Sequence, residues 1–481
     1  MQPIPPHRPQ PLHNVARTRA LESALTALLP PHTLMQRAGL ATAQLALALA
    51  PHAQRYWIAC GPGNNGGDGL EAAMHLQQWG KTAQVTWLGT PDSAPADAQA
   101  AYARAVAAGV QFIDTPPAAC DFCIDALLGI GAHRPAQGRL AESITHINTL
   151  RVPVLAVDLP SGLQADTGAC DGPTVRATHT LSLLTCKVGL YTGHGRDCAG
   201  HIWFESLGAS AVPAPPAHAM LCGAPAPIAR PHVSHKGSYG DVAVIGGAPG
   251  MTGAALLAAS AALHQGAGRV LVGLLDSGHL ALDVHHPEVM LRPIASLDPA
   301  QLTVVCGCGG GSAVAAQLPR LLSTAPQLVL DADALNAIAQ DAQLQALLRA
   351  RETRTRQTVL TPHPLEAARL LGSNTAEVQH DRLAAAQQLA HRFACTVVLK
   401  GSGTVVAAPS TTPAINPTGN ARLATAGTGD VLAGMVGAYL AQGLPAFLAA
   451  CRAVWLHGRA ADTWPANRPL TASALAGTCS V

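Results

Sequence analysis

Short apolar runs alternate with longer Ala-rich stretches along most of the chain. In the first half, residues 56–60 and 154–157 are apolar runs, and residues 94–108 form an Ala-rich stretch. Short apolar runs of this kind are typical of strands buried on both faces, and helices between them are what a parallel sheet requires. The pattern therefore predicts an α/β fold.

The same alternation returns in the second half, with strands expected at 242–245, 270–274, 304–305, 328–330 and 396–399 and a helix at 254–265. Between the halves, residues 209–227 are rich in Ala and Pro and lack a periodic apolar pattern, which is typical of a semi-rigid linker. With 481 residues and 48% apolar composition, the chain is long enough for two cores. We predict two three-layer α/β/α domains, residues 1–208 and 228–481.

Composition limits the classes of partner. The net charge is +2 with only 12% charged residues, and no Lys/Arg block marks a nucleic-acid or membrane surface. The Pro-rich amino terminus lacks the apolar core of a signal peptide, and no apolar run approaches the length of a membrane span, so a cytoplasmic protein is expected. The cysteines are scattered, and neither Cys120/Cys123 nor Cys306/Cys308 has a partner pair at zinc-site spacing. Small-molecule partners are the remaining expectation.

The sequence CGPGNNGGDG, residues 60–69, follows the strand expected at 56–60 and precedes a helix expected at 70–79. A loop between a strand and a helix is where open α/β sheets bind ligands. Glycines let backbone N–H groups approach a phosphate, and the helix dipole favours negative charge there. A plain turn is the alternative, but the density of Gly, Asn and Asp favours a binding loop, and the pattern fits neither the dinucleotide nor the P-loop fingerprint.

Two further strand ends carry acids. DALLGIG begins at Asp125, and AVDLPSGL contains Asp158 and Ser161. Either aspartate alone could be a helix cap. Because the carboxyl ends of parallel strands share one edge of the sheet, we expect all three loops to converge on one crevice.

These three motifs, with LMQRAG at residues 34–39, resemble the NAD(P)H-hydrate epimerase domain, and the likeness covers roughly residues 10–208. The resemblance implies a Rossmann-like fold, with Asp158 as the acid/base and potassium ligands at Asn65, Asp125 and Ser161, all oxygen donors suited to a hard cation. It further implies that the hydrated dinucleotide is bound by Asn64, Asn65, Gly66, Gly67, Asp68, Gly129, Ile130, Gly131, Ala132, His133, Arg134 and Pro135.

The second half carries its own motifs: HKGSYGDVAVIGG, LDADALN, LTPHPLE, LKGSGT and NPTGNARLATAGTGDVLAG. In the last of these, a Gly-Thr-Gly turn precedes a helix and supplies N–H groups for phosphate oxygens. Asp430 follows at the helix start, where it can accept a proton from a substrate hydroxyl. A plain helix cap is the alternative reading of Asp430.

In this order, over roughly residues 228–480, the motifs resemble the ADP/ATP-dependent NAD(P)H-hydrate dehydratases of the ribokinase-like fold. The resemblance implies that Asp430 is the general base. At residues 307–311 this chain has Gly-Cys-Gly-Gly-Gly, where the family usually has Gly-Pro-Gly-Leu-Gly. It implies adenine-nucleotide contacts at Lys400, Gly401, Ser402, Gly403, Thr404 and Gly429, and dinucleotide contacts at Ala254, Gly309, His363 and Asp430.

Together the two resemblances imply a bifunctional enzyme that repairs hydrated NADH and NADPH (NADHX and NADPHX). One domain would interconvert the R and S forms, and the other would dehydrate the S form with ADP, or ATP, and Mg²⁺. A homo-oligomer that binds no nucleic acid and no membrane is expected. Two alternatives stay open: a small-molecule kinase with a regulatory amino-terminal half, and a nucleotide sensor without turnover.

Overall fold

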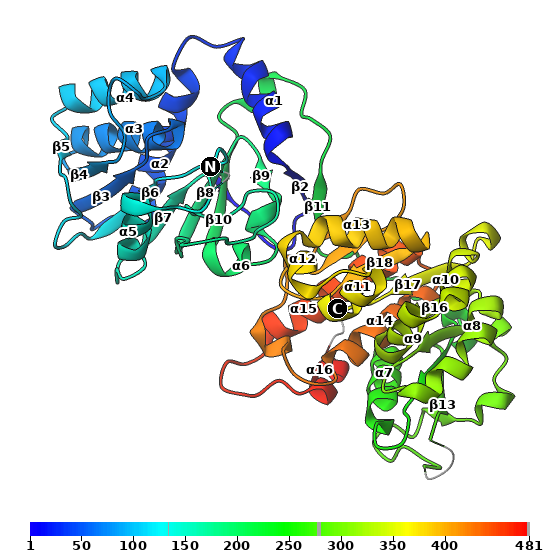
Figure 1. Cartoon of the computed structure of the whole chain (residues 1–481). Coiled ribbons are helices and arrows are strands. Elements are labelled where there is room, and N and C mark those ends of the chain that lie inside the picture. The colour runs from blue at the N-terminus through cyan, green and yellow to red at the C-terminus, as the bar shows by residue number, and fades with distance from the viewer. Residues whose placement is uncertain (133, 277–279, 479–481) are drawn as a thin grey trace. The chain divides into compact units, whose positions relative to one another are not determined.

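The computed structural model describes residues 1–132, 134–276 and 280–478 (Figure 1). The chain divides into two compact units, the first formed by Met1–Pro5 and Gln10–Ala219 and the second by Pro6–Pro9 and Met220–Val481. Each unit contains a mostly parallel sheet with helices on both faces, so the predicted α/β/α layers are confirmed. Among the described residues, no helix combines the length and apolar character that a membrane span needs.

The first unit is built on a sheet in which only the short edge strand β1 is antiparallel to its neighbour. In spatial order, its strands are β1 (Gln2–Pro3), β10 (His201–Glu205), β8 (His179–Leu183), β7 (Val154–Val157), β6 (Phe122–Ala126), β3 (Arg55–Cys60), β4 (Thr82–Trp87) and β5 (Gln111–Phe112). Strands β2 (Gln10–His13) and β9 (Cys186–Lys187) also pair in parallel. Its helices are α1 (Val15–Thr26), α2 (Thr33–Leu49), α3 (Asn64–Gln78), α4 (Ala96–Ala107), α5 (Gly138–Ile147) and α6 (Gly195–Cys198).

Strand β3 shows why this sheet is covered on both faces. Tyr56 and Ile58 pack in the core beneath α2, α3 and α4, whereas Trp57 and Ala59 pack in a second core with Ile144 of α5. Because successive side chains point to opposite faces of a strand, an uninterrupted apolar run fits a strand with a core on each side.

The second unit contains a larger sheet in which β18, β19 and β20 pair antiparallel and the other pairs are parallel. In spatial order, its strands are β14 (Met290–Leu291), β13 (Arg269–Leu274), β12 (Asp241–Gly246), β15 (Thr303–Cys306), β16 (Gln327–Leu330), β17 (Gln357–Leu360), β18 (Thr396–Leu399), β19 (Val405–Ala407), β20 (Ala414–Ile415) and β11 (Ala219–Leu221). Its helices are α7 (Thr252–His264), α8 (Leu318–Thr324), α9 (Ala332–Gln340), α10 (Ala342–Arg349), α11 (Pro364–Leu371), α12 (Thr375–His380), α13 (Arg382–Phe393), α14 (Thr428–Ala441), α15 (Ala446–Thr463) and α16 (Ala472–Thr478).

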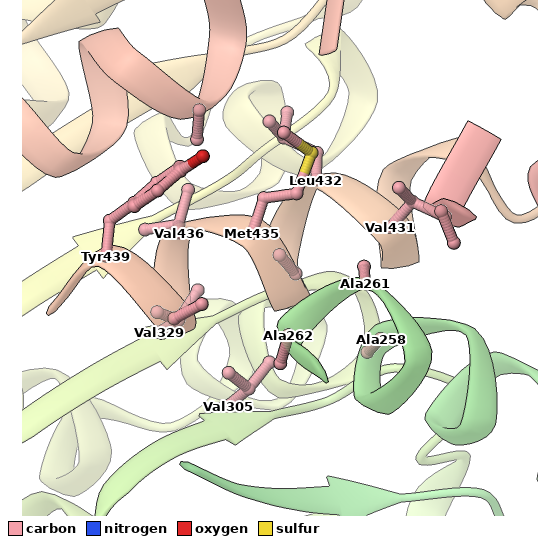
Figure 2. Close-up of a cluster of buried hydrophobic side chains, with 14 of the residues drawn as sticks. Ala258, Ala261, Ala262, Val305, Val329, Val431, Leu432, Met435, Val436 and Tyr439 are labelled. Atoms are coloured by element: carbon pink, nitrogen blue, oxygen red, sulfur yellow. The ribbon is translucent and has the colours of Figure 1, made fainter. Parts of the chain in front are cut away.

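Helix α14 is held deep in this unit by its apolar residues. Figure 2 shows Met435 and Val436 of α14 above Ala262 of α7, with Val305 and Val329 of the sheet below. Gly434 lets the helices approach closely, because a Cβ there would lie 2.0 Å from the carbonyl oxygen of Ala258. This packing fixes the amino-terminal end of α14, and with it Asp430, in its first turn.

The structure differs from the sequence predictions at the start of α3 and within the predicted linker. The helix expected at 70–79 begins at Asn64, so most of the predicted binding loop is the first two turns of α3. The reason is close packing: a Cβ on Gly66 would lie 2.0 Å from the carbonyl oxygen of Gly61, and only glycine allows the helix to start so near the strand. Within the predicted linker, Ala219–Leu221 forms β11, which pairs with β20.

Candidate functional site

The first unit contains a cavity of about 440 Å³ at the carboxyl ends of its central strands. Of the residues implied by the epimerase resemblance, the cavity is lined by Asn64, Asn65, Asp68, Gly129, Ile130, Gly131, Ala132 and Asp158. Gly66 and Gly67 are buried inside α3, Arg134 and Pro135 are exposed outside the lining, and His133 lies outside the described residues. The predicted convergence of the three loops on one crevice is therefore present.

Asp158 has the geometry of a functional residue. It follows β7 with φ of 69°, a left-handed conformation that is uncommon for a non-glycine residue and tends to occur at functional sites. Its backbone N–H donates to the carbonyl oxygen of Leu181 at 2.8 Å, and its Oδ1 accepts from the backbone N–H of Leu183 at 3.1 Å. These bonds hold the carboxylate at the wall of the cavity.

Lys187 is the partner that sequence reasoning missed. Its fully buried ammonium donates to Oδ1 of Asp158 and to the carbonyl oxygen of Leu183 at 2.6 Å, and it lines the same cavity. A lysine is almost never fully buried unless it is paired. The sequence signal for Lys187 is its position directly after the mostly apolar segment LSLLTC. A charged residue next to a segment that is expected to be buried needs a partner for its charge.

Two further acids face this cavity. Burial raises the pKa of Asp68 well above its ordinary value, and the nearby charges of Asp158 and Glu22 raise it further. Burial, followed by the charge of Asp158, also raises the pKa of Glu22. Acids with raised pKa values inside a cavity are typical of sites that transfer protons.

Beneath the cavity, Asp125 and Ser161 are fully buried and are hydrogen-bonded to each other. The Ser161 hydroxyl donates to Oδ1 of Asp125 at 2.6 Å, and its backbone N–H donates to Oδ2 at 2.8 Å. Burial raises the pKa of Asp125 to about 6. Asn65 contributes a buried amide nitrogen without a hydrogen-bond partner. Since the amide oxygen and nitrogen of Asn can exchange places, this side chain can present an oxygen there.

In the second unit, the predicted residues gather at the carboxyl ends of parallel strands. Lys400 follows β18 and donates through Nζ to Oδ1 of Asp331, 2.7 Å away, at the end of β16. The same nitrogen lies 3.4 Å from the Cβ position of Gly429, at the start of α14. A cation beside a helix amino terminus suits phosphate oxygens.

Asp430 lies beside this ion pair. One of its carboxylate oxygens, one from Asp331 and the Cys308 sulfur are within 4.8 Å of one another. Burial raises the pKa of Asp430 to about 6, and the Asp331 charge acts in the same direction. A base with a pKa near neutrality is suited to accept a hydroxyl proton.

The other predicted residues of the second unit lie in loops and at helix ends. A Cβ on Gly309 would lie 2.9 Å from that of Ala254, so these two adjoin. Gly401, Ser402 and Gly403 form the turn between β18 and β19, with Thr404 at its end. His363 caps α11, where its Nδ1 accepts from Leu365 N at 3.1 Å and Glu366 N at 3.3 Å.

Comparisons with known proteins decide between the open alternatives. A family model described as YjeF-related protein N-terminus matches residues 31–189, and one described as NAD(P)H-hydrate dehydratase matches residues 242–479. The bifunctional NAD(P)H-hydrate repair enzyme Nnr of Escherichia coli (strain K12) is 36% identical over 91% of this chain and 86% of its own length. The chain belongs to the family of bifunctional NAD(P)H-hydrate repair enzymes. Membership confirms the predicted repair function and the pairing of an epimerase with a dehydratase.

Other relatives of this repair-enzyme family cover the chain in whole or in half. The bifunctional NAD(P)H-hydrate repair enzyme Nnr of Coxiella burnetii is 35% identical over 94% of both chains. The ADP-dependent (S)-NAD(P)H-hydrate dehydratase of Neisseria meningitidis is 47% identical over 52% of this chain and 85% of its own. A solved ADP/ATP-dependent NAD(P)H-hydrate dehydratase from Bacillus subtilis, co-crystallized with ATP/Mg²⁺, is 30% identical over 52% of this chain and 91% of its own, with a TM-score of 0.44.

Proposed function

We propose that residues 1–208 interconvert the R and S forms of NADHX and NADPHX, and that residues 228–481 dehydrate the S form at the expense of an adenine nucleotide, with residues 209–227 as the connection. The observation that carries the first half is the Asp158–Lys187 pair inside the cavity. Incubation with mixed R and S hydrates, ADP and Mg²⁺ tests the whole proposal: complete recovery of the reduced-nicotinamide absorbance is expected, and recovery of only the S fraction contradicts the epimerase assignment.

For epimerisation, Asp158 is proposed as the acid/base. The carbon that carries the hydroxyl is attached to the ring nitrogen, whose lone pair can expel the hydroxyl as water once an acid protonates it. Water returning to the opposite face inverts the carbon and gives the proton back. Lys187 holds the Asp158 carboxylate toward the cavity and supplies a positive charge beside it, so the pair can pass a proton in either direction.

The potassium ligands are proposed to be Asn65, Asp125 and Ser161. The donor set fits a hard monovalent cation: Asp125 brings a buried negative charge, Ser161 a hydroxyl oxygen, and Asn65 an amide with an unpartnered buried atom. A bound potassium ion would supply positive charge beneath the nucleotide loop. The segments 64–68 and 129–135, which contribute Asn64, Asn65, Asp68 and residues 129–132 to the cavity lining, would then bind the dinucleotide.

For dehydration, Asp430 is proposed as general base. It accepts the proton of the substrate hydroxyl while that oxygen attacks the terminal phosphoryl group of the nucleotide, so that the oxygen–phosphorus bond forms as the anhydride bond breaks. Loss of phosphate and of a ring proton then restores the double bond, and ADP leaves as AMP. Lys400 and Gly429 would bind the phosphates, the turn from Gly401 to Thr404 the rest of the nucleotide, and Ala254, Gly309 and His363 the substrate.

The nucleotide is proposed to be ADP, since the Neisseria meningitidis relative is named as ADP-dependent; ATP is the alternative. Mg²⁺, when bound, would neutralise the phosphates, largely through its own waters. Cytoplasmic location and homo-oligomeric state stay predictions. A phosphorylated product that accumulates in the same incubation would contradict the proposed loss of phosphate.

A further inference from the structure

Three side chains that can ligate a metal meet at strand ends of the second unit. Cys308 comes two residues after β15, Asp331 directly follows β16, and Asp430 lies in the first turn of α14. Strands β15 and β16 are parallel neighbours, so Cys308 and Asp331 emerge at the same edge of the sheet. The sulfur and one carboxylate oxygen from each aspartate lie within 4.8 Å of one another.

The contacts of these residues leave donor atoms facing one another. Cys308 is fully buried, and its thiol is hydrogen-bonded to Asp430. Asp331 uses a single oxygen, Oδ1, to accept from Thr361 Oγ1 at 2.8 Å and from Lys400 Nζ at 2.7 Å. Neither of these two bonds engages its Oδ2. A thiol and two carboxylates are thus held together by contacts that do not use up their capacity to bind a cation.

We propose that Cys308, Asp331 and Asp430 form a binding site for a thiophilic divalent cation, Zn²⁺ or Cd²⁺. Thiolate sulfur selects such ions over Mg²⁺, which prefers oxygen alone. Zinc–ligand bonds of about 2.0 to 2.3 Å place tetrahedral ligand atoms about 3.3 to 3.8 Å apart. Separations of at most 4.8 Å need a contraction of no more than about 1 to 1.5 Å to reach these values, which side-chain rotation can provide, and water fills the fourth position.

The charges of the site favour a divalent ion despite the neighbouring Lys400 ammonium. Binding releases the thiol proton of Cys308 to solvent, so the ligands become one thiolate and two carboxylates. The three ligands and the Lys400 ammonium together carry two negative charges, which a divalent cation neutralises, and the neighbouring acids Glu366 and Asp333 also attract a cation. A buried site is most favourable when its charges balance in this way.

The bound ion takes up the Asp430 oxygen that would otherwise accept a substrate proton. Dehydration is then blocked while epimerisation, at a site in the first unit, continues. This consequence rests on the proposed function of Asp430, whereas the metal site itself does not.

The test is a direct binding measurement on the full chain. Zn²⁺ binding by equilibrium dialysis and the ultraviolet thiolate–Cd²⁺ absorption are compared among wild type, Cys308→Ala, Asp331→Asn and the matched control Cys306→Ala, whose thiol is also fully buried but is not among the three ligands. All four chains also carry Cys170→Ser and Cys222→Ser, because Cys170–Cys198 and Cys222–Cys451 are hydrogen-bonded thiol pairs that could bind the same ions.

We expect binding to weaken at least about tenfold in Cys308→Ala and Asp331→Asn and to persist in Cys306→Ala. Equal binding by Cys308→Ala and the control overturns the site. If a variant does not fold, X-ray absorption of the zinc-loaded parent chain decides: one sulfur ligand with oxygen neighbours supports the site, and any other sulfur count overturns it. Metal binding through Cys308 with undiminished dehydratase activity leaves the site standing and contradicts the role of Asp430.

Discussion

The ammonium of Lys187 donates to Oδ1 of Asp158, although the two residues come from different strand ends and the lysine is fully buried. Lys187 lies on β9, which pairs with β2, and Asp158 follows β7. Removing either partner leaves a buried, uncompensated charge. The pair therefore links the stability of the cavity wall to its proposed chemistry.

We expect Lys187→Met to reduce the rate of epimerisation about 10²-fold or more, because the proposed acid/base loses the charge that positions it. Lys187→Arg keeps the positive charge and should retain more activity than the Met variant. Interconversion of purified R hydrate into S hydrate is the measurement, with dehydration of S hydrate as the control for the second domain. Wild-type epimerisation in a folded Lys187→Met chain would contradict the proposal.

Potassium should be needed for epimerisation and not for dehydration. Replacing K⁺ by choline at equal ionic strength should slow epimerisation and lower the unfolding temperature of the first domain, because a ligand that binds only the folded state stabilises it. Asp125→Asn keeps the size of the side chain but removes its charge. It should abolish the increase in unfolding temperature that K⁺ causes in the first domain. A K⁺ effect of unchanged size in Asp125→Asn would rule out these ligands.

The glycines of CGPGNNGGDG were only partly explained by the sequence. Gly61 and Gly63 do lie between β3 and α3, as predicted, since Gly density at a strand end is a local signal, whereas the other three glycines lie inside α3. That α3 begins at Asn64 was not predicted, because the cause is a tertiary contact: Gly66 packs on the carbonyl oxygen of Gly61. Conformational freedom and close packing select the same residue, and the sequence alone does not separate them.

A pair of substitutions separates these two reasons. A Cβ on Gly66 would meet the Gly61 oxygen at 2.0 Å, whereas a Cβ on Gly63, which has φ of −99°, meets nothing within 4 Å. Gly66→Ala should lower the free energy of unfolding by about 1 to 3 kcal/mol, and Gly63→Ala, at the N-cap of α3, should lower it by only about 0.5 kcal/mol. Denaturant unfolding of both variants is the measurement, and equal effects would show that packing is not the reason for Gly66.

Residues that act together from distant segments were the harder part of the site. Asp430 was found from its local AGTGD sequence, but nothing local connects it with Cys308 or Asp331, which lie at the ends of other strands. Cysteine spacing indicated no metal site for the same reason, since spacing rules detect ligands from one segment or two. The order of the strands in the sheet brings the ends that carry Cys308 and Asp331 together, and no single motif encodes that order.

The pH dependence of dehydration should report on Asp430. Burial raises its pKa to about 6, and a base must be ionised to accept a proton, so kcat/KM for the S hydrate should fall below about pH 6 and be level above it. The raised pKa also means that the folded state favours the protonated carboxyl. Its contribution to stability is present at low pH and is lost as pH rises through about 6. Asp430→Asn should therefore be more stable than wild type at pH 8 and no more stable at pH 4.

The same substitution separates chemistry from folding in the second domain. The N-cap of α14 is Gly427, so Asp430 does not cap the helix, and α14 is held by its buried apolar residues. Asp430→Asn should therefore fold and bind adenine nucleotide. Loss of a positioned base should reduce dehydration by about 10²- to 10⁴-fold, while the interconversion of R and S hydrates through Asp158 continues. Rates of NADH recovery from S hydrate and of R-to-S conversion, measured on one preparation, check both statements. Dehydration near the wild-type rate would make Asp430 a structural residue of the helix end and would move the search for the base to its neighbours, beginning with Asp331, whose carboxylate lies within the same 4.8 Å cluster.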